Sequence, residues 1–153
     1  MMRALAIPLL VIAFLPGSGG LTGNWQADLS ASILPAGFPK LRSQTMKLER
    51  LPGKLQCVTE RVTIEGTKTR AEFSAAFDGK RYPVTGIPEI STVSLHKYRE
   101  FIEADFFYAQ APVFSYRLWV VKTDDSLIVI SIDPVTRKKL HARIVYHRQP
   151  AER

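Results

Sequence analysis

Apolar and polar residues alternate along nearly the whole chain after Leu21, and a period of two is typical of β-strands. Short turn-forming sequences such as Pro52-Gly53 and Asp78-Gly79 separate the alternating segments. The pattern predicts ten strands, over residues 22–29, 43–51, 55–64, 69–77, 81–85, 92–98, 101–108, 113–122, 127–133 and 138–148. Residues 30–42 do not fit a strand, and we expect a loop with one helical turn there.

Ten short strands joined by tight turns are typical of an antiparallel meander. Such a sheet usually closes into a barrel, because closure removes the exposed edges of the first and last strands. We therefore expect an all-β fold, a single antiparallel up-and-down β-barrel of about 8–10 strands. The barrel domain is expected over residues 21–149, with residues 150–153 as a C-terminal tail.

The apolar positions of three hairpins predict their registers, because a slip of one residue moves every side chain to the other face. The predicted opposed pairs are Tyr108 with Phe114, Phe106 with Tyr116, Asp105 with Arg117, Glu103 with Trp119, Ile130 with Leu140, Ile128 with Ala142, Val62 with Ala71, Val58 with Ala75 and, on the outside, Arg61 with Glu72. These registers give the barrel a continuous apolar lining.

The predicted interior is rich in aromatic residues and includes one carboxylate, that of Glu60, opposite Phe73. The inward aromatic residues on these registers are Phe73, Phe77, Phe106, Tyr108, Phe114, Tyr116 and Tyr146. They form either a filled core, as in many small barrels, or a cavity for one apolar ligand. The candidate ligand-binding residues are Glu60, Phe73, Phe106, Tyr108, Tyr116 and Tyr146. Glu60 lies either in the interior, where a carboxylate must be paired, protonated or ligand-bound, or at a solvated mouth.

The first twenty residues have the three-part pattern of a secretory signal peptide: a basic start at Arg3, an apolar run over residues 4–15, and small or turn-forming residues over 16–20. Cleavage is expected near Gly19 or Gly20, which makes the protein secreted or periplasmic. A retained, tilted anchor is the alternative, although an apolar run this short falls below the ~20 residues that span a bilayer.

The net charge and the cysteine count add two constraints on the fold and its chemistry. The whole chain has a formal net charge of +7 and one cysteine, Cys57. With one cysteine an intramolecular disulfide is excluded, so the fold must depend on its core. Cys57 is either a small buried residue or a thiol that reacts or pairs between molecules.

The last strand places several basic side chains on one face: Arg137, Lys139, His141, Arg143 and His147. This is either a solvated outer face or a contact for an anionic partner through Arg137, Lys139, His141 and Arg143. Nucleic acid is not expected as a partner, because no aromatic residues alternate with these charges on that face. We expect a monomer.

Residues for catalysis or for metal and cofactor binding are not indicated, and no cofactor is expected. His141 and His147 share a face, but at ~3.3 Å per residue they stand about 20 Å apart, too far for one zinc ion. The sequence contains none of the common metalloprotease, nucleophile-elbow, phosphate-loop or dinucleotide motifs. A binding protein is therefore expected rather than an enzyme.

Two motifs resemble a known group of proteins. Gly23-Asn24-Trp25 resembles the G-x-W opening of lipocalins and fatty-acid-binding proteins, and in lipocalins this Trp closes one end of the barrel beneath an Arg of the last strand. For that structural role beside Trp25, Arg143 and Arg148 are the candidates. The sequence DGKRYPVTG at 78–86, followed by TVSLHKY at 92–98, resembles small exported bacterial lipocalin-like proteins of unknown function. The resemblance covers most of the mature chain and implies a lipocalin-like barrel but no activity.

The sequence departs from these families at two places. Ala27-Asp28 stands where the exported group has Leu-Asn, so the loop after the first strand is expected to differ. Fatty-acid-binding proteins hold a carboxylate with an R-x-Y pair on the last strand, whereas Arg143 and Tyr146 here are three residues apart and lie on opposite faces. That site therefore does not transfer directly.

The function expected from these observations is non-catalytic carriage of a small apolar or amphipathic ligand in the barrel interior. The alternative is a protein-interaction or inhibitor module with a packed core that acts through its outer surface. An interior void of ~300 Å³ or more favours the carrier, and a filled interior favours the surface module.

Overall fold

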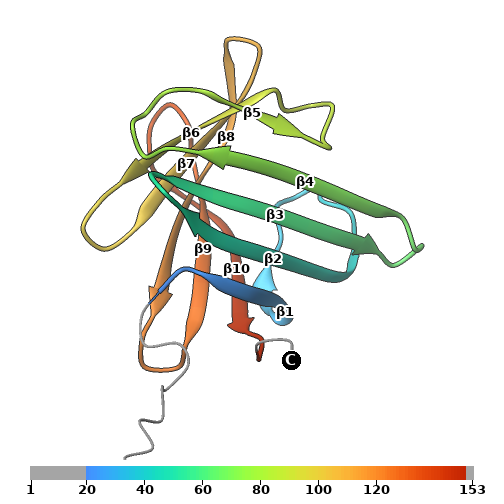
Figure 1. Ribbon diagram of the computed structural model, residues 1–153. Helices are drawn as coiled ribbons and strands as arrows, with labels where there is room; N and C mark the ends of the chain where they lie inside the picture. Colours follow the sequence, from blue (N-terminus) through green and yellow to red (C-terminus); the bar gives the residue numbers. More distant parts are fainter. Residues whose placement is uncertain (1–19, 151–153) are drawn as a thin grey trace, which may run out of the picture.

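A computed structural model describes residues 20–150, and within them ten antiparallel strands form one closed barrel (Figure 1). The strands are β1 (Gly23–Ile33), β2 (Leu41–Leu51), β3 (Lys54–Thr63), β4 (Lys68–Ala75), β5 (Tyr82–Thr85), β6 (Thr92–Lys97), β7 (Ile102–Tyr108), β8 (Ala111–Val121), β9 (Ser126–Ile132) and β10 (Lys139–Arg148). Each strand pairs with its neighbour in sequence, and β1 also pairs with β10, which closes the barrel. The predicted all-β, up-and-down barrel is confirmed.

The described residues contain no helix of a length and hydropathy that would span a membrane. The predicted signal peptide, with cleavage near Gly19 or Gly20, falls outside the described residues except for Gly20.

The segment between the first two strands is more extended than predicted. Strand β1 continues to Ile33, only residues 34–40 form the loop, and this loop contains no helical turn. The pairing of β1 with β10 is interrupted between Asp28 and Ile33. There the Asp28 carboxylate accepts a hydrogen bond from the Ala31 N–H, and the Ser32 hydroxyl accepts one from the Val145 N–H. These side chains satisfy backbone groups that a regular ladder would pair, so the strand persists through the irregularity.

The β7–β8 hairpin keeps the predicted faces but has a different register. A two-residue turn at Ala109-Gln110 and a bulge near Phe107 place Phe106 opposite Phe114 and Glu103 opposite Arg117. The predicted loop over 109–113 was therefore too long, and the predicted pairs of Asp105 with Arg117 and Glu103 with Trp119 are wrong. Because the difference is an even number of residues, the inward face is unchanged.

In the β3–β4 hairpin, the face of β3 that points inward is the one predicted to point outward. The turn over residues 64–67 pairs Cys57 with Phe73 and Val58 with Glu72, an odd shift from the predicted register. Leu55, Cys57, Thr59 and Arg61 consequently line the interior, whereas Val58, Glu60 and Val62 face outward. Strand β3 has apolar residues on both faces, so alternation alone did not determine its orientation.

The inward face of strand β9 also differs from the predicted one. It pairs Val129 with Leu118 and Ile130 with Arg143, so Leu127 and Val129 join the core. Ile128 and Ile130 belong to the other face, and their predicted pairs with Ala142 and Leu140 are wrong. Five of the six residues over 127–132 are large and apolar, which leaves the pattern without a preferred face.

One end of the barrel is closed by Trp25, which is fully buried. The Trp25 Nε1–H donates to the Leu21 carbonyl at 2.9 Å, and the Arg148 guanidinium lies over the ring with its Cζ 4.2 Å from the centroid. A Cβ on Gly23 would lie 2.6 Å from Nη1 of Arg148, so the Gly of the G-x-W sequence makes room for this arginine. Of the two candidates, Arg148 therefore covers Trp25, and Arg143 does not, because Arg143 is exposed on the outer face.

Candidate ligand-binding site

The barrel interior contains a cavity of about 740 Å³. It lies among the strands and reaches the end that carries the β1–β2, β5–β6 and β9–β10 connections, away from Trp25. Large aliphatic side chains make much of its wall, among them Leu48, Leu55, Val84, Leu95, Leu118 and Val129. Cavities of this size and composition are typical of sites for small molecules.

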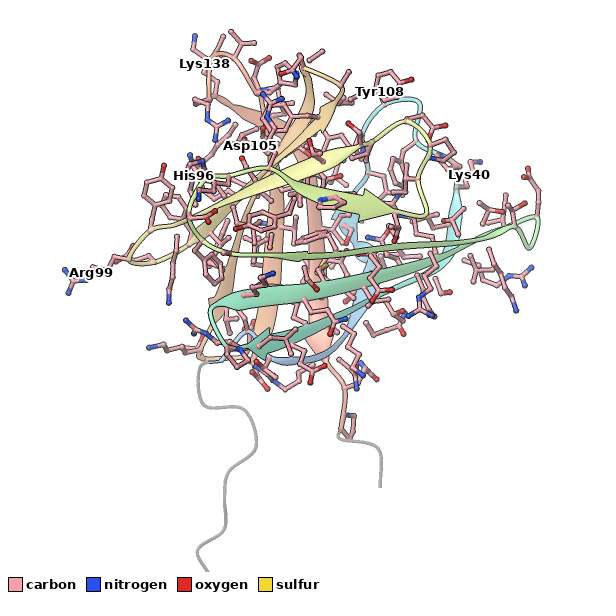
Figure 2. All side chains as sticks on the ribbon, turned by 45° about the horizontal axis from the view of Figure 1, so that its top comes forward. Lys40, His96, Arg99, Asp105, Tyr108 and Lys138 are labelled. Atoms are coloured by element: carbon pink, nitrogen blue, oxygen red, sulfur yellow. The ribbon has the colours of Figure 1, made fainter. Side chains whose placement is uncertain are left out.

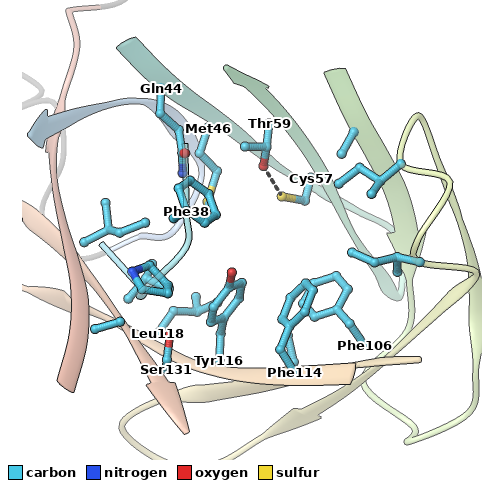
Figure 3. A pocket seen from close by; sticks show the side chains of 18 of the residues that line it. Phe38, Gln44, Met46, Cys57, Thr59, Phe106, Phe114, Tyr116, Leu118 and Ser131 are labelled. Carbon is cyan, nitrogen blue, oxygen red and sulfur yellow. Dashed lines mark hydrogen bonds between the residues drawn. The ribbon is translucent and has the colours of Figure 1, made fainter. Parts of the chain in front are cut away.

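Aromatic rings form one continuous wall of the cavity, where Phe106, Phe114 and Tyr116 project into the space from β7 and β8 (Figure 3). The Phe106 and Phe114 rings stack at 4.6 Å between centroids, and Phe114 contacts Tyr116 at 4.9 Å. Phe73 of β4 meets the edge of Phe106 at 5.9 Å. Such ring pairs fix one another's orientation, so this wall presents a rigid apolar surface.

A cluster of polar side chains from four strands interrupts the apolar lining. The Arg61 Nε–H of β3 donates to Gln44 Oε1 of β2 at 2.7 Å, and the Gln44 Nε2–H donates to the Tyr146 hydroxyl of β10. Gln44 and Tyr146 are buried, and Arg61 is half-buried. Tyr116 of β8 completes this polar cluster, which consists of Gln44, Arg61, Tyr116 and Tyr146.

Both phenols of the polar cluster remain protonated near neutral pH. Burial raises the pKa of Tyr116, and the nearby Arg61 guanidinium opposes that rise by its charge and hydrogen bonding. Burial also raises the pKa of Tyr146, outweighing the hydrogen bond from Gln44. Both hydroxyls therefore keep a proton to donate to a ligand.

The β1–β2 loop contributes to the cavity at its open end. Pro35 and Phe38 line the cavity, and the Phe38 N–H donates to the Pro35 carbonyl at 3.1 Å to form a turn. The Arg61 guanidinium stacks on the Phe38 ring, with Cζ 4.6 Å from the centroid. The loop is thus held against the polar cluster by a cation–π contact.

Four of the six candidate ligand-binding residues lie at this site: Phe73, Phe106, Tyr116 and Tyr146. Tyr108 does not, because the tight β7–β8 turn places it at the rim with 57% of its surface exposed, and Figure 2 shows it at the periphery of the molecule. Glu60 does not either: its side chain is 58% exposed on the outer face, 3.9 Å from Arg70. The expected inward direction of these two residues is wrong.

Arg61 and Gln44 were not identified from the sequence. Arg61 was placed outside by the predicted β3 register, and Gln44 stood in a strand with no clear face. The alternation of Leu55, Cys57 and Thr59 with Arg61 was the signal for the observed face, and it competes with the alternation of Val58 and Val62.

Cys57 also lines the cavity, and its Sγ lies 3.8 Å from Thr59 Oγ1 (Figure 3). Burial raises the pKa of the Cys57 thiol to about 11, so the reactive thiolate is scarce at neutral pH. This thiol therefore contributes an apolar surface to the wall rather than a nucleophile.

The basic residues of the last strand divide into two groups. Lys139 and Arg143 are exposed, as an outer face requires, whereas the exposed His141 borders the open end of the cavity; their contact with an anionic partner stays a prediction. Arg137 is instead engaged: its Nη1–H donates to Asp105 at 2.7 Å, and its Nη2–H donates to the buried Glu103. Glu103 also receives a hydrogen bond from Arg117 at 2.7 Å. Arg137 therefore belongs to an ion-pair network that ties the β9–β10 turn to β7 and β8.

Residues 20–150 hold no group of three or more His, Cys, Asp or Glu side chains arranged to bind a metal ion. Comparison with protein-family models, curated proteins and solved structures found no match to this chain. What the site does must therefore be inferred from its geometry.

Proposed function

We propose that this protein is an exported binding protein that carries one small apolar or amphipathic molecule in the barrel interior without transforming it. The observation that carries the proposal is the cavity of about 740 Å³ with its aliphatic and aromatic walls. A surface module would gain nothing from an unfilled interior, because each buried void costs packing contacts. Export is part of the same proposal and is based on the pattern of residues 1–20.

Apolar burial would supply most of the binding free energy, at ~25 cal/mol per Å² removed from water before the costs of association. The aromatic wall is already ordered by ring–ring contacts, so little side-chain entropy is lost when a ligand binds. The polar cluster gives the cavity one hydrogen-bonding side, which favours an amphipathic ligand over a purely apolar one.

Binding of Nile red, a neutral apolar dye, to the mature protein tests the proposal by fluorescence titration. We expect saturable binding that Tyr116→Ala weakens by about tenfold, because the variant removes a ring from the cavity wall. Ala71→Trp, which places a large side chain into the same cavity, should weaken binding as well.

Tyr108→Ala is the matched control, because Tyr108 is exposed at the rim, and its affinity for the dye should stay within about twofold of the wild type. Absence of binding when the protein is titrated against the dye up to about 1 mM would reject the carrier. An equal loss of dye affinity in Tyr108→Ala and Tyr116→Ala would place the dye outside the cavity and would also reject the carrier.

A further inference from the structure

The polar cluster contains one fixed positive charge, that of Arg61, in an otherwise largely apolar cavity. Desolvating a guanidinium is costly unless an anion or a set of hydrogen bonds compensates it. Within residues 20–150, no carboxylate lies within 4.0 Å of the Arg61 guanidinium, whereas Arg117 and Arg148 each have one and Arg137 has two. Arg61 is thus a cation in the cavity without an anionic partner from the described chain.

The contacts of Arg61 hold the guanidinium in place without neutralising it. The Arg61 Nε–H donates to Gln44 Oε1, and one face of the guanidinium plane covers the Phe38 ring. Gln44 is in turn fixed by its hydrogen bond to Tyr146, whose ring is fully buried. Apart from the hydrogen bonding with Tyr116, the terminal nitrogens, which carry most of the donors of an arginine, are left for a further partner.

Two phenol hydroxyls stand beside this cation. Tyr116 lies close enough to Arg61 for the charge to act on its phenol, and Tyr146 accepts from Gln44 while keeping its own O–H to donate. An arginine fork and two hydroxyl donors together match the two oxygens of a carboxylate.

We propose that the ligand is an amphipathic carboxylate, with its head group bound by Arg61, Tyr116 and Tyr146 and its apolar chain lying along Phe73, Phe106 and Phe114. This inference rests on the proposed carrier function and specifies the class of ligand. A single negative charge matches the single arginine of the cluster; a phosphate monoester, at roughly −1.5 to −2 near pH 7, would leave charge uncompensated. The arginine comes from β3, on a different strand from the R-x-Y pair of fatty-acid-binding proteins.

The other charged or titratable side chains that line the cavity do not compete for this role. Glu89 and His141 are exposed at the open end, and the Cys57 thiol is neutral at physiological pH. Among residues 20–150, Arg61 is therefore the only cation inside the cavity that a carboxylate entering from the open end would meet.

Displacement of Nile red by matched twelve-carbon probes tests the inference: dodecanoate, dodecanol and dodecylammonium. We expect dodecanoate to bind about tenfold or more tightly than dodecanol, and dodecylammonium to bind most weakly, because only the carboxylate pairs with Arg61. Arg61→Met should abolish the preference for dodecanoate, because it weakens the binding of dodecanoate far more than that of dodecanol. Arg61→Lys should keep part of the preference, since the charge remains but the fork is lost.

Arg42→Met is the matched control, because Arg42 is exposed on β2 and bonds only the Ile64 carbonyl among the described residues. It should keep the full preference for dodecanoate. Equal binding of dodecanoate and dodecanol by the wild type would overturn the inference and leave the carrier function standing. An equal loss of both probes in Arg61→Met would overturn it as well, by showing that Arg61 only shapes the cavity. Failure of Nile red and all three probes to bind would overturn the carrier function itself.

Discussion

At the scale of single residues, Gly86 shows why one position of the DGKRYPVTG sequence must be glycine. Its φ is 93°, and a Cβ there would lie 1.7 Å from the carbonyl oxygen of Arg70 on β4. No small movement relieves such a contact, because the obstructing atom belongs to the backbone of a paired strand. Gly86 therefore permits the close approach of β5 to β4 at a point where only two residue pairs join these strands.

We expect Gly86→Ala to lower the free energy of unfolding by more than ~3 kcal/mol, since backbone strain and a backbone clash add. Gly66→Ala is the matched control: Gly66 has a φ of 94° but open space around the position of a Cβ. It should lose only ~1–2 kcal/mol from the unfavourable φ. Urea denaturation measures both, and equal losses would show that the contact with Arg70 is not the cause.

At the scale of elements, the network of Glu103, Arg117, Arg137 and Asp105 joins three parts of the barrel wall. Glu103 is only 5% exposed, although it lies on the outer face of β7. Arg117 reaches it from β8, and Arg137 reaches it from the β9–β10 turn, where its φ is 61°. Pairing of this kind fixes the turn against the neighbouring strands, and removal of one partner leaves charges uncompensated.

The network predicts a loss of stability in acid. Burial raises the pKa of Glu103, but hydrogen bonds and charges from Arg117 and Arg137 outweigh it and hold the pKa below its ordinary value of 4.5. A depressed pKa in the folded state contributes stability above the ordinary value, and this contribution is lost as the pH falls below 4.5 through the folded pKa. Glu103→Gln should lower the free energy of unfolding at pH 7 by ~1–3 kcal/mol and flatten its decrease in acid.

Glu65→Gln serves as the control for this prediction, because Glu65 is exposed and forms no ion pair with the rest of residues 20–150. The free energy of unfolding of Glu65→Gln should decrease in acid as much as that of the wild type. Chemical denaturation at a series of pH values makes the comparison, and an unchanged acid decrease in Glu103→Gln would contradict the assignment.

The individual strands show where the alternation of apolar and polar residues determines the inward face and where it does not. Strands β4, β7, β8 and β10 have one face clearly more apolar than the other, so their inward residues, such as Phe73 and Tyr116, followed from the sequence. Strands β3 and β9 are apolar on both faces, and each was assigned the wrong one. The polar cluster was hidden by the same reasoning, because placing apolar residues inside puts Arg61 outside by construction. A β-bulge at Phe107 and a two-residue turn also depend on local backbone energies that the hydrophobic pattern does not contain.

At the scale of the whole molecule, Arg148 joins the segment before β1 to the last strand. Its Nε–H donates to Asp125 at 2.9 Å in the β8–β9 turn, and its Nη2–H donates to the Gly20 carbonyl at 2.6 Å. Since Arg148 also covers Trp25, a single side chain joins the segment before β1, the last strand and a turn between two others. This closes the end of the barrel away from the cavity opening.

We expect Arg148→Leu to lower the free energy of unfolding by ~2–4 kcal/mol, because several hydrogen bonds and the contact with Trp25 are lost together. Arg143→Leu, at an exposed position of the same strand, should change it by less than ~0.5 kcal/mol. Thermal or urea unfolding followed by Trp fluorescence compares the two. Similar losses would indicate that charge on β10, rather than the contacts of Arg148, stabilises the barrel.

The chain contains a single sulfhydryl group, and it faces the cavity. A maleimide reagent used near neutral pH, where it spares amines, has one sulfur atom to alkylate, and the adduct would occupy part of the cavity volume. A molecule bound in the cavity would shield that atom, so the rate of alkylation reports occupancy without any engineered label. The molecule thus carries its own footprinting probe for occupancy of the cavity.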